Sequence, residues 1–131
     1  MTALRIILGV VVGLAAGVGL VFVGEMLNHQ LWPPPEDLQV TDPEAVRAYF
    51  ETAPLEALFG LPLVWIVAAG AGSFLGAKIA NRAWAGWIVG GLLLAATLLN
   101  LSLIPHPLWM WATGVLGVAL AAYFAAKLGA A

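Results

Sequence analysis

The distribution of charge constrains this chain more than any other feature of its sequence. Charged side chains are absent from residues 6–24, 57–77 and 83–126, which are runs of 19, 21 and 44 residues. A helix needs about 20 mostly apolar residues to cross the hydrocarbon core of a bilayer. The first two runs are each long enough for one crossing, and the third is long enough for two.

Prolines divide the third run. Pro105 and Pro107 lie near its middle, and a proline restricts the residue before it and cannot continue a hydrogen-bonded helix. We therefore predict an all-α membrane protein with a single domain, in which four transmembrane helices form a compact bundle. The predicted spans are about 4–30, 56–80, 83–104 and 106–128. The first span is too long for the apolar region of a signal peptide, so we expect it to be retained as a signal anchor.

Composition excludes several classes of function. Only 9% of the residues are charged and 63% are hydrophobic, against roughly 25% and about 45–50% in soluble domains. The net charge of −2 and the lack of a basic stripe exclude a nucleic-acid partner. With no cysteine there is no disulfide or thiolate metal site. No nucleophile–base pair stands out, so we expect neither an enzyme nor a bound cofactor.

The basic residues predict the orientation in the membrane. Four of the five fall on one side if the chain crosses four times: Arg5, Lys78, Arg82 and Lys127. Only Arg47 falls on the other side. The positive-inside rule then places both termini in the cytoplasm of a bacterium and the protein in its inner membrane. The segments 31–55 and 104–108 are expected to face the periplasm.

The tryptophans agree with this layout. All six lie near the expected membrane boundaries, and aromatic rings favour both membrane interfaces. We therefore interpret each of them as an interfacial anchor: Trp32, Trp65, Trp84, Trp87, Trp109 and Trp111.

The acidic segment between the first two spans contains a short predicted helix, about 42–52. Asp42 is expected to cap its N-terminus, with Pro43 in the first helical position; a capping box of Thr41 with Glu44 is the alternative. Apolar residues recur at helical spacing at Val46, Tyr49, Phe50 and Ala53. This amphipathic helix either packs over the bundle as a lid or serves only as a tether.

A weak internal repeat links the two halves of the chain. Residues 19–35 and 91–107 share seven identities in 17 positions. The repeat predicts two helical hairpins of the same topology, related by an axis along the membrane normal, with the acidic helix inserted in the first. Chance similarity between two stretches rich in leucine and glycine is the alternative.

Glycines recur at every fourth position within the first three predicted spans, and Gly117 continues the pattern of small residues in the last span with Ala121 and Ala125. Small residues let helix backbones approach closely in lipid, where no hydrophobic force drives association. The pattern predicts tight packing within the bundle or between the subunits of a homo-oligomer: Gly9, Gly13, Gly17, Gly72, Gly76, Gly86, Gly90 and Gly117.

Few polar residues within or beside the spans could carry chemistry, and five of them belong to the outer leaflet: Glu25, Asn28, His29, Asn100 and His106. Glu25 and His29 are four residues apart and share a helical face. Asn100 corresponds to Asn28 in the repeat. We expect these five side chains to converge on one patch beneath the acidic helix.

Three functions of this patch compete. Glu25, His29 and His106 could supply three ligands to a divalent metal and leave one position open. Glu25 could be the titratable group of a small oligomeric transporter or channel, because an intramembrane carboxylate suggests function. The patch could instead be a hydrogen-bonded cap in which Glu25 pairs with His29.

The leading hypothesis is a structural or accessory protein that presents its periplasmic face to a membrane-protein partner. A transporter would need a solvent-connected cavity that reaches toward the midplane and is lined by Glu25 or Asn100, whereas an accessory protein should have a filled bundle.

Four short motifs carry a resemblance. They are His-Gln-Leu-Trp-Pro-Pro-Pro at 29–35, Thr-Asp-Pro at 41–43, Ala-Pro-Leu at 53–55 and Ile-Pro-His-Pro-Leu-Trp at 104–109. Through them the chain resembles a group of small uncharacterised bacterial four-span inner-membrane proteins. No activity is attached to that group, so the resemblance implies only the fold and the location in the membrane.

Overall fold

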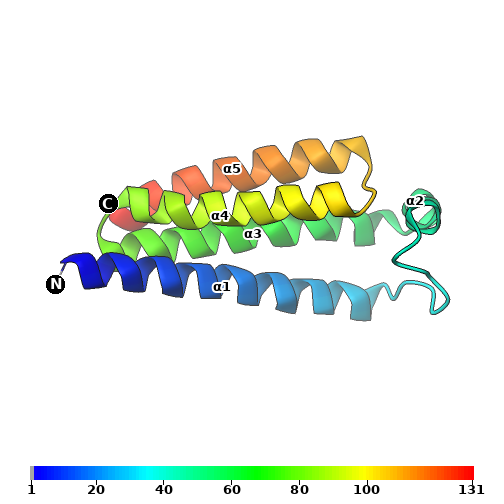
Figure 1. Ribbon diagram of the computed structural model, residues 1–131, viewed down its shortest axis with the longest axis horizontal. Helices are drawn as coiled ribbons and strands as arrows, with labels where there is room; N and C mark the ends of the chain where they lie inside the picture. Colours follow the sequence, from blue (N-terminus) through cyan, green and yellow to red (C-terminus); the bar gives the residue numbers. More distant parts are fainter. Residues whose placement is uncertain (1) are drawn as a thin grey trace.

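The computed structural model describes residues 2–131, which contain five α-helices and no strand. Four of them are long, apolar, and run side by side, whereas the fifth is short and lies at one end (Figure 1). The helices are α1 (Thr2–Leu31), α2 (Pro43–Thr52), α3 (Leu55–Ala80), α4 (Ala83–Leu103) and α5 (Leu108–Ala130). The chain is therefore an all-α membrane protein with four transmembrane helices, as the uncharged runs predicted.

The helix ends lie within about two residues of the predicted boundaries. The largest difference is in the last span, which was expected over 106–128 but runs from Leu108 to Ala130. Helix α5 begins later because Pro107 holds an extended conformation, with φ −60° and ψ 149°, and serves as its N-cap. The segment between Leu103 and Leu108 is therefore a turn outside the helices.

Helix α3 is the centre of the bundle and packs against each of the other three spans. Helix α1 lies along α3 and touches α4 less extensively. Both termini lie at the same end as the α3–α4 turn, and α2 lies at the opposite end (Figure 1). We call these the basic end and the acidic end; the basic end carries Arg5, Lys78, Arg82 and Lys127.

Glycines bring the backbones of α1 and α3 into direct contact. A β-carbon built on Gly9 would lie 2.6 Å from the Gly76 carbonyl oxygen, and one on Gly13 would lie 2.5 Å from that of Gly72. Such distances leave no room for a side chain, so these glycines set how closely the two helices approach. The glycines of α4 and α5 also face neighbouring helices: Gly86, Gly90 and Gly117.

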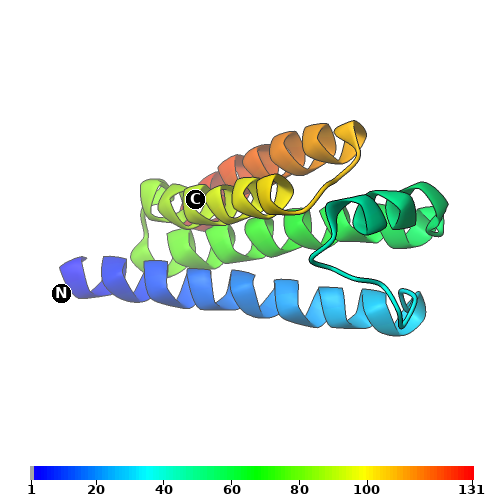
Figure 2. The ribbon, with the colours of Figure 1, turned by 45° about the vertical axis from the view of Figure 1, so that its right-hand side comes forward.

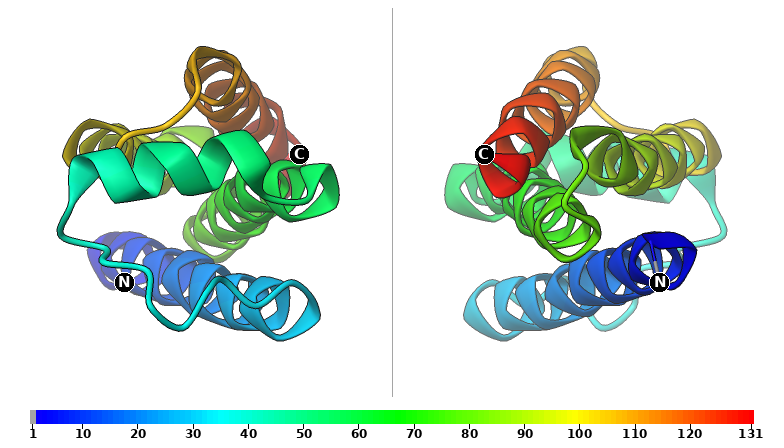
Figure 3. Two further views of the ribbon diagram at one scale, coloured as in Figure 1. Left: turned by 90° about the vertical axis from the view of Figure 1, so that its right-hand side faces the viewer. Right: turned by 90° about the vertical axis from the view of Figure 1, so that its left-hand side faces the viewer.

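Helix α2 lies across the acidic end of the bundle (Figure 3, left). The Asp42 side chain caps it by accepting a hydrogen bond from the Glu44 backbone N–H at 3.1 Å, with Pro43 in the first turn. Val46 is only 5% exposed, and Phe50 packs against the core of the bundle. Figure 2 shows α2 leading, through a short connection, into the start of α3. The amphipathic helix is thus a lid and not only a tether.

The glycine contact between α1 and α3 yields a first prediction. Gly13→Ala should lower the free energy of unfolding by about 1–3 kcal/mol, because an overpacked contact must separate the two backbones. Gly19→Ala is the matched control, since nothing lies within 4 Å of a β-carbon at Gly19. Thermal unfolding in detergent, followed by tryptophan fluorescence, measures both variants. Equal stability of the two variants would contradict the assigned contact.

Candidate functional site

A cavity of about 290 Å³ lies between α1, α3 and α4. It extends from the level of Glu25 and Asn100 to Leu93, which occupies the middle of α4. The cavity therefore reaches from the outer part of the acidic half to the centre of the bundle. Its walls are largely apolar: Val18, Val21, Phe22, Trp65, Ala68, Ala69, Leu93 and Ala96, with Glu25, Thr97 and Asn100 as the polar members.

Glu25 accepts a hydrogen bond from a buried tryptophan. The indole Nε1 of Trp65 donates to Glu25 Oε1 at 3.1 Å, and Trp65 is only 5% exposed. This differs from the expectation that Trp65 anchors the protein at the membrane interface. A buried indole N–H needs a hydrogen-bond partner, and the carboxylate supplies it. The two residues lie 40 positions apart in the sequence, so no local pattern could have paired them.

The opposite wall of the cavity carries Thr97 and Asn100. The Thr97 hydroxyl donates back to the Leu93 carbonyl oxygen at 2.9 Å, which leaves it satisfied within its own helix. The Asn100 side chain is half-buried and has no hydrogen-bond partner among residues 2–131. The cavity therefore contains one singly bonded carboxylate and one unengaged amide on facing helices.

Asn28 and His29 do not join this cavity. Asn28 is 7% exposed, and its side-chain Nδ2 donates to the Ala57 carbonyl oxygen at 3.3 Å, which ties α1 to the first turn of α3. Gly60 makes room for it, since a β-carbon there would lie 2.5 Å from Asn28 Oδ1. His29 is exposed. The predicted pairing of Glu25 with His29 is not formed, because Glu25 turns toward Trp65.

His106 lies between the lid and the cavity. Its Nδ1 is 2.6 Å from the Ile104 carbonyl oxygen, so the neutral ring donates from that nitrogen. The ring centroid is 5.2 Å from that of Phe50 in α2 and 6.0 Å from that of Trp65 in α3. Burial among these rings lowers the pKa of His106 below its ordinary value of 6.5, against smaller opposing effects of backbone carbonyls and Glu25.

The predicted three-ligand metal site does not form. Within residues 2–131, no three His, Cys, Asp or Glu side chains come close enough together to hold a metal ion. Each candidate ligand is engaged elsewhere or turned away: Glu25 faces Trp65, His29 is exposed, and His106 bonds to a backbone carbonyl. Of the five residues expected to converge, only Glu25 and Asn100 line the cavity.

Comparisons with known proteins give no relative from which a function could be inferred, so the function must be inferred from the geometry of the cavity. No protein-family model matches the chain, and no curated protein or solved structure is significantly similar to it. The chemistry of the cavity follows from its walls. A carboxylate and an amide can fix a polar group at one end, and apolar side chains can cover an apolar group as far as the middle of the bundle.

The packing of His106 predicts pH-dependent stability. Because its pKa is lower in the folded protein than the ordinary 6.5, protonation favours the unfolded state. Stability should be full above about pH 7 and should fall as the pH drops through 6.5 toward the lowered pKa. His106→Gln should flatten this part of the profile of melting temperature against pH.

The only other histidine provides the control. His29 is exposed, so His29→Gln should leave the pH profile unchanged. Loss of stability below pH 6.5 that persists equally in both variants would show that His106 is not its source.

Proposed function

We propose that this integral membrane protein binds a small amphiphilic molecule with an amine or other cationic head group. The observation that carries the proposal is the cavity of about 290 Å³ with Glu25 near one end and apolar walls reaching the middle of the bundle. Cavities that bind small molecules are mostly apolar, contain a few placed polar groups, and begin at roughly 300 Å³. A compact ligand fits this size.

The polar end of the cavity favours a cation. A carboxylate within a membrane span is costly to keep charged unless an opposite charge or several hydrogen bonds offset the lost hydration. Among residues 2–131, Glu25 receives a single hydrogen bond, from a neutral indole. An ammonium group would supply the missing charge and could also donate to the side-chain oxygen of Asn100. The aromatic rings of Phe22 and Trp65 add favourable faces for a cation.

The apolar part of the ligand would enter from the side of the bundle. Phe22 is 73% exposed, and Ala96 on α4 is also exposed. Both line the cavity, so its edge between α1 and α4 faces the surrounding lipid. Toward the basic end, a β-carbon on Gly17 would lie 2.7 Å from Leu93 Cδ1, which closes the cavity there. A single copy thus resembles a binding site more than a channel, and transport would require α1 to move away from Leu93.

Ligand binding can be measured with hexylamine and hexanol, which share one chain and differ in charge. In lipid nanodiscs, calorimetry should show that Glu25→Gln weakens hexylamine binding about tenfold or more, as expected when a charge-assisted hydrogen bond of about 1.5–3 kcal/mol is lost. Hexanol binding should change little.

Two further variants complete this test. Glu36→Gln, in the exposed loop after α1, should bind both compounds like the unaltered protein. Ala96→Phe narrows the cavity from its exposed edge and should weaken both. Unchanged hexylamine affinity in Glu25→Gln would rule out the proposed role of the carboxylate.

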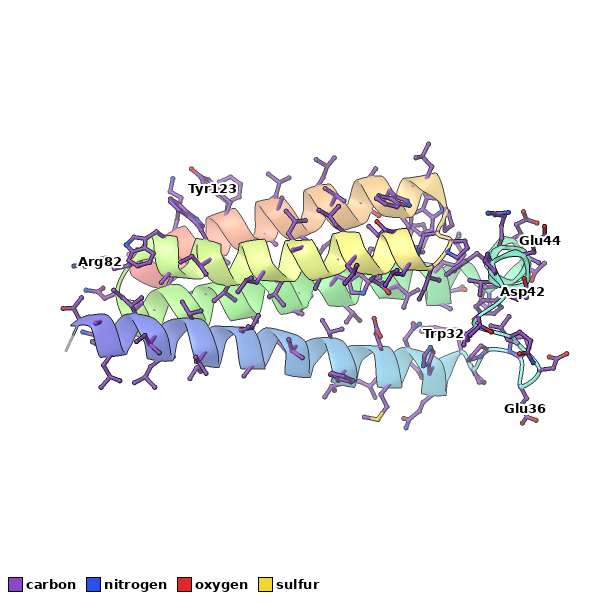
Figure 4. All side chains as sticks on the ribbon, in the orientation of Figure 1. Trp32, Glu36, Asp42, Glu44, Arg82 and Tyr123 are labelled. Atoms are coloured by element: carbon purple, nitrogen blue, oxygen red, sulfur yellow. The ribbon has the colours of Figure 1, made fainter. Side chains whose placement is uncertain are left out.

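A second candidate function is an accessory role in which the acidic end faces a protein partner. The observation that favours it is the fixed polar surface of the lid: the apolar side of α2 packs on the bundle, and Glu44, Arg47 and Glu51 remain exposed. Glu36, Asp42 and Glu44 project from this end, opposite Arg82 (Figure 4). In this role we place the protein in a bacterial inner membrane, with both termini cytoplasmic and α2 in the periplasm.

Single cysteines test the orientation and the accessory role together, because the chain contains no cysteine of its own. In intact spheroplasts, a membrane-impermeant maleimide should label Glu44→Cys but not Lys127→Cys. The reverse pattern would contradict the positive-inside assignment. A crosslinker attached at Glu44→Cys should give a discrete crosslinked species that is absent from Lys127→Cys. If none forms, the accessory role loses its support.

A further inference from the structure

The acidic end holds a second pocket, separate from the cavity between the spans. It measures about 380 Å³ and lies between α2 and the turn that joins α4 to α5. Its lining contains aromatic residues, two prolines, one basic residue and one acidic residue. They are Phe50, His106, Trp109, Pro105, Pro107, Arg47 and Glu51. None of the residues that line the lateral cavity lines this pocket.

Arg47 and Glu51 are the charged residues of this pocket, and neither side chain has a partner within the described part of the chain. They lie four positions apart in α2, one helical turn from each other, and both are exposed. Among residues 2–131 neither side chain makes a hydrogen bond or an ion pair with another residue. The pocket therefore presents one free cation and one free anion beside aromatic rings.

We propose that this pocket binds the zwitterionic head group of a phospholipid, with its phosphate on Arg47 and its ammonium group on Glu51. The guanidinium group is suited to phosphate oxygens, which it binds through paired hydrogen bonds. The carboxylate is the natural partner of an ammonium group. An ethanolamine-type head group carries a negative and a positive charge a short distance apart. Arg47 and Glu51, on neighbouring turns of α2, present the opposite charges at a similarly short separation.

The charge of the acidic end selects against purely anionic head groups. Arg47 is its only basic residue, whereas six acidic residues lie in the segment from Glu36 to Glu56. An anionic head group without an amine would gain one attraction and meet several repulsions. A head group that also carries an ammonium group gains an attraction to the surrounding carboxylates.

The depth of the pocket matches the position of lipid head groups. Trp109 is the second residue of α5, and the two prolines immediately precede that helix, so the pocket lies where the spans end. The Trp109 ring packs against Phe59 with centroids 5.0 Å apart, which holds it at this level. Tryptophan rings favour the head-group region of a bilayer. A phospholipid could place its head group here without leaving its leaflet.

The test uses delipidated full-length protein in detergent and short-chain lipids that differ only in head group. Dihexanoyl phosphatidylethanolamine should raise the melting temperature at concentrations at which dihexanoyl phosphatidylglycerol does not. Arg47→Gln should weaken phosphatidylethanolamine binding tenfold or more. Glu51→Gln should instead remove the preference for phosphatidylethanolamine over phosphatidylglycerol, which a merely structural role of Glu51 would not do.

Two control variants show whether lipid binding depends on this pocket alone. Glu44→Gln lies on α2 outside the pocket lining and should leave lipid binding unchanged. Glu25→Gln, which removes the carboxylate of the lateral cavity, should also leave lipid binding unchanged. The proposals for the two sites are therefore tested independently.

Three results would overturn the proposal. The first is unaltered phosphatidylethanolamine binding by Arg47→Gln, and the second is equal binding of the two lipids by the unaltered protein. The third is soluble glycerophosphoethanolamine binding as tightly as the lipid, which would make a free phosphoamine the ligand instead of a membrane lipid.

Discussion

The close contact between the backbones of α1 and α3 determines the rest of this bundle. Gly9, Gly13 and Gly17 repeat at every fourth residue and lie against α3 and Leu93 of α4. The same spacing continues with Val21 and Glu25, which carry side chains and line the cavity instead. The change from glycine to larger residues along one stripe therefore marks where direct backbone contact between α1 and α3 ends, and beyond it the two helices are joined through side chains such as that of Asn28. The basic half is closed by backbone packing, and the acidic half has room for a ligand.

The single hydrogen bond to Glu25 gives this open half its chemical character. Removing a carboxylate from water is costly. The neutral indole of Trp65 is the group bonded to Glu25, and no counter-ion to it lies within the part of the chain that the structure describes. Such a group is stable in a membrane protein when it faces a cavity that admits a cation or water. Under the proposed function, a ligand would complete this site by pairing with Glu25 and with the Asn100 side chain, which has no hydrogen-bond partner among residues 2–131.

The sequence predicted the fold more fully than the site, for a physical reason. Span lengths follow from uncharged runs, and the start of α2 follows from Asp42 and Pro43, because these effects act within a few residues. The prolines at 105 and 107 predicted the break between α4 and α5, although α5 begins two residues later than expected. The partners of Glu25 and Asn28 are tertiary and depend on how α1 is rotated against α3. The spacing of four residues within α1 predicted His29 as the partner of Glu25, but His29 is exposed.

A signal for that rotation was present in the glycines. Asn28 follows Gly17 by eleven residues, which is close to three turns of a helix with 3.6 residues per turn. The glycine face of α1, continued along the helix with this period, therefore passes through Asn28 and not through His29. The burial of Trp65 had no comparable signal, since an aromatic residue near a span end equally suits an interface.

The internal repeat predicted from the sequence pairs residues of the acidic end that have different surroundings in the structure. At an offset of 72 residues the ends of α1 and α4 coincide, as Leu31 and Leu103, and Glu25 corresponds to Thr97. Glu25 and Thr97 both line the cavity between α1 and α4, but the positions that the predicted repeat pairs differ in their contacts. The Asn28 side chain is hydrogen-bonded to α3, whereas the Asn100 side chain has no hydrogen-bond partner among residues 2–131. Helix α2 is inserted in the first hairpin only. It lies over the α4–α5 turn, and the second pocket lies between α2 and that turn. The contact between the rings of His106, which lines this pocket, and Trp65, which lines the lateral cavity, separates the two.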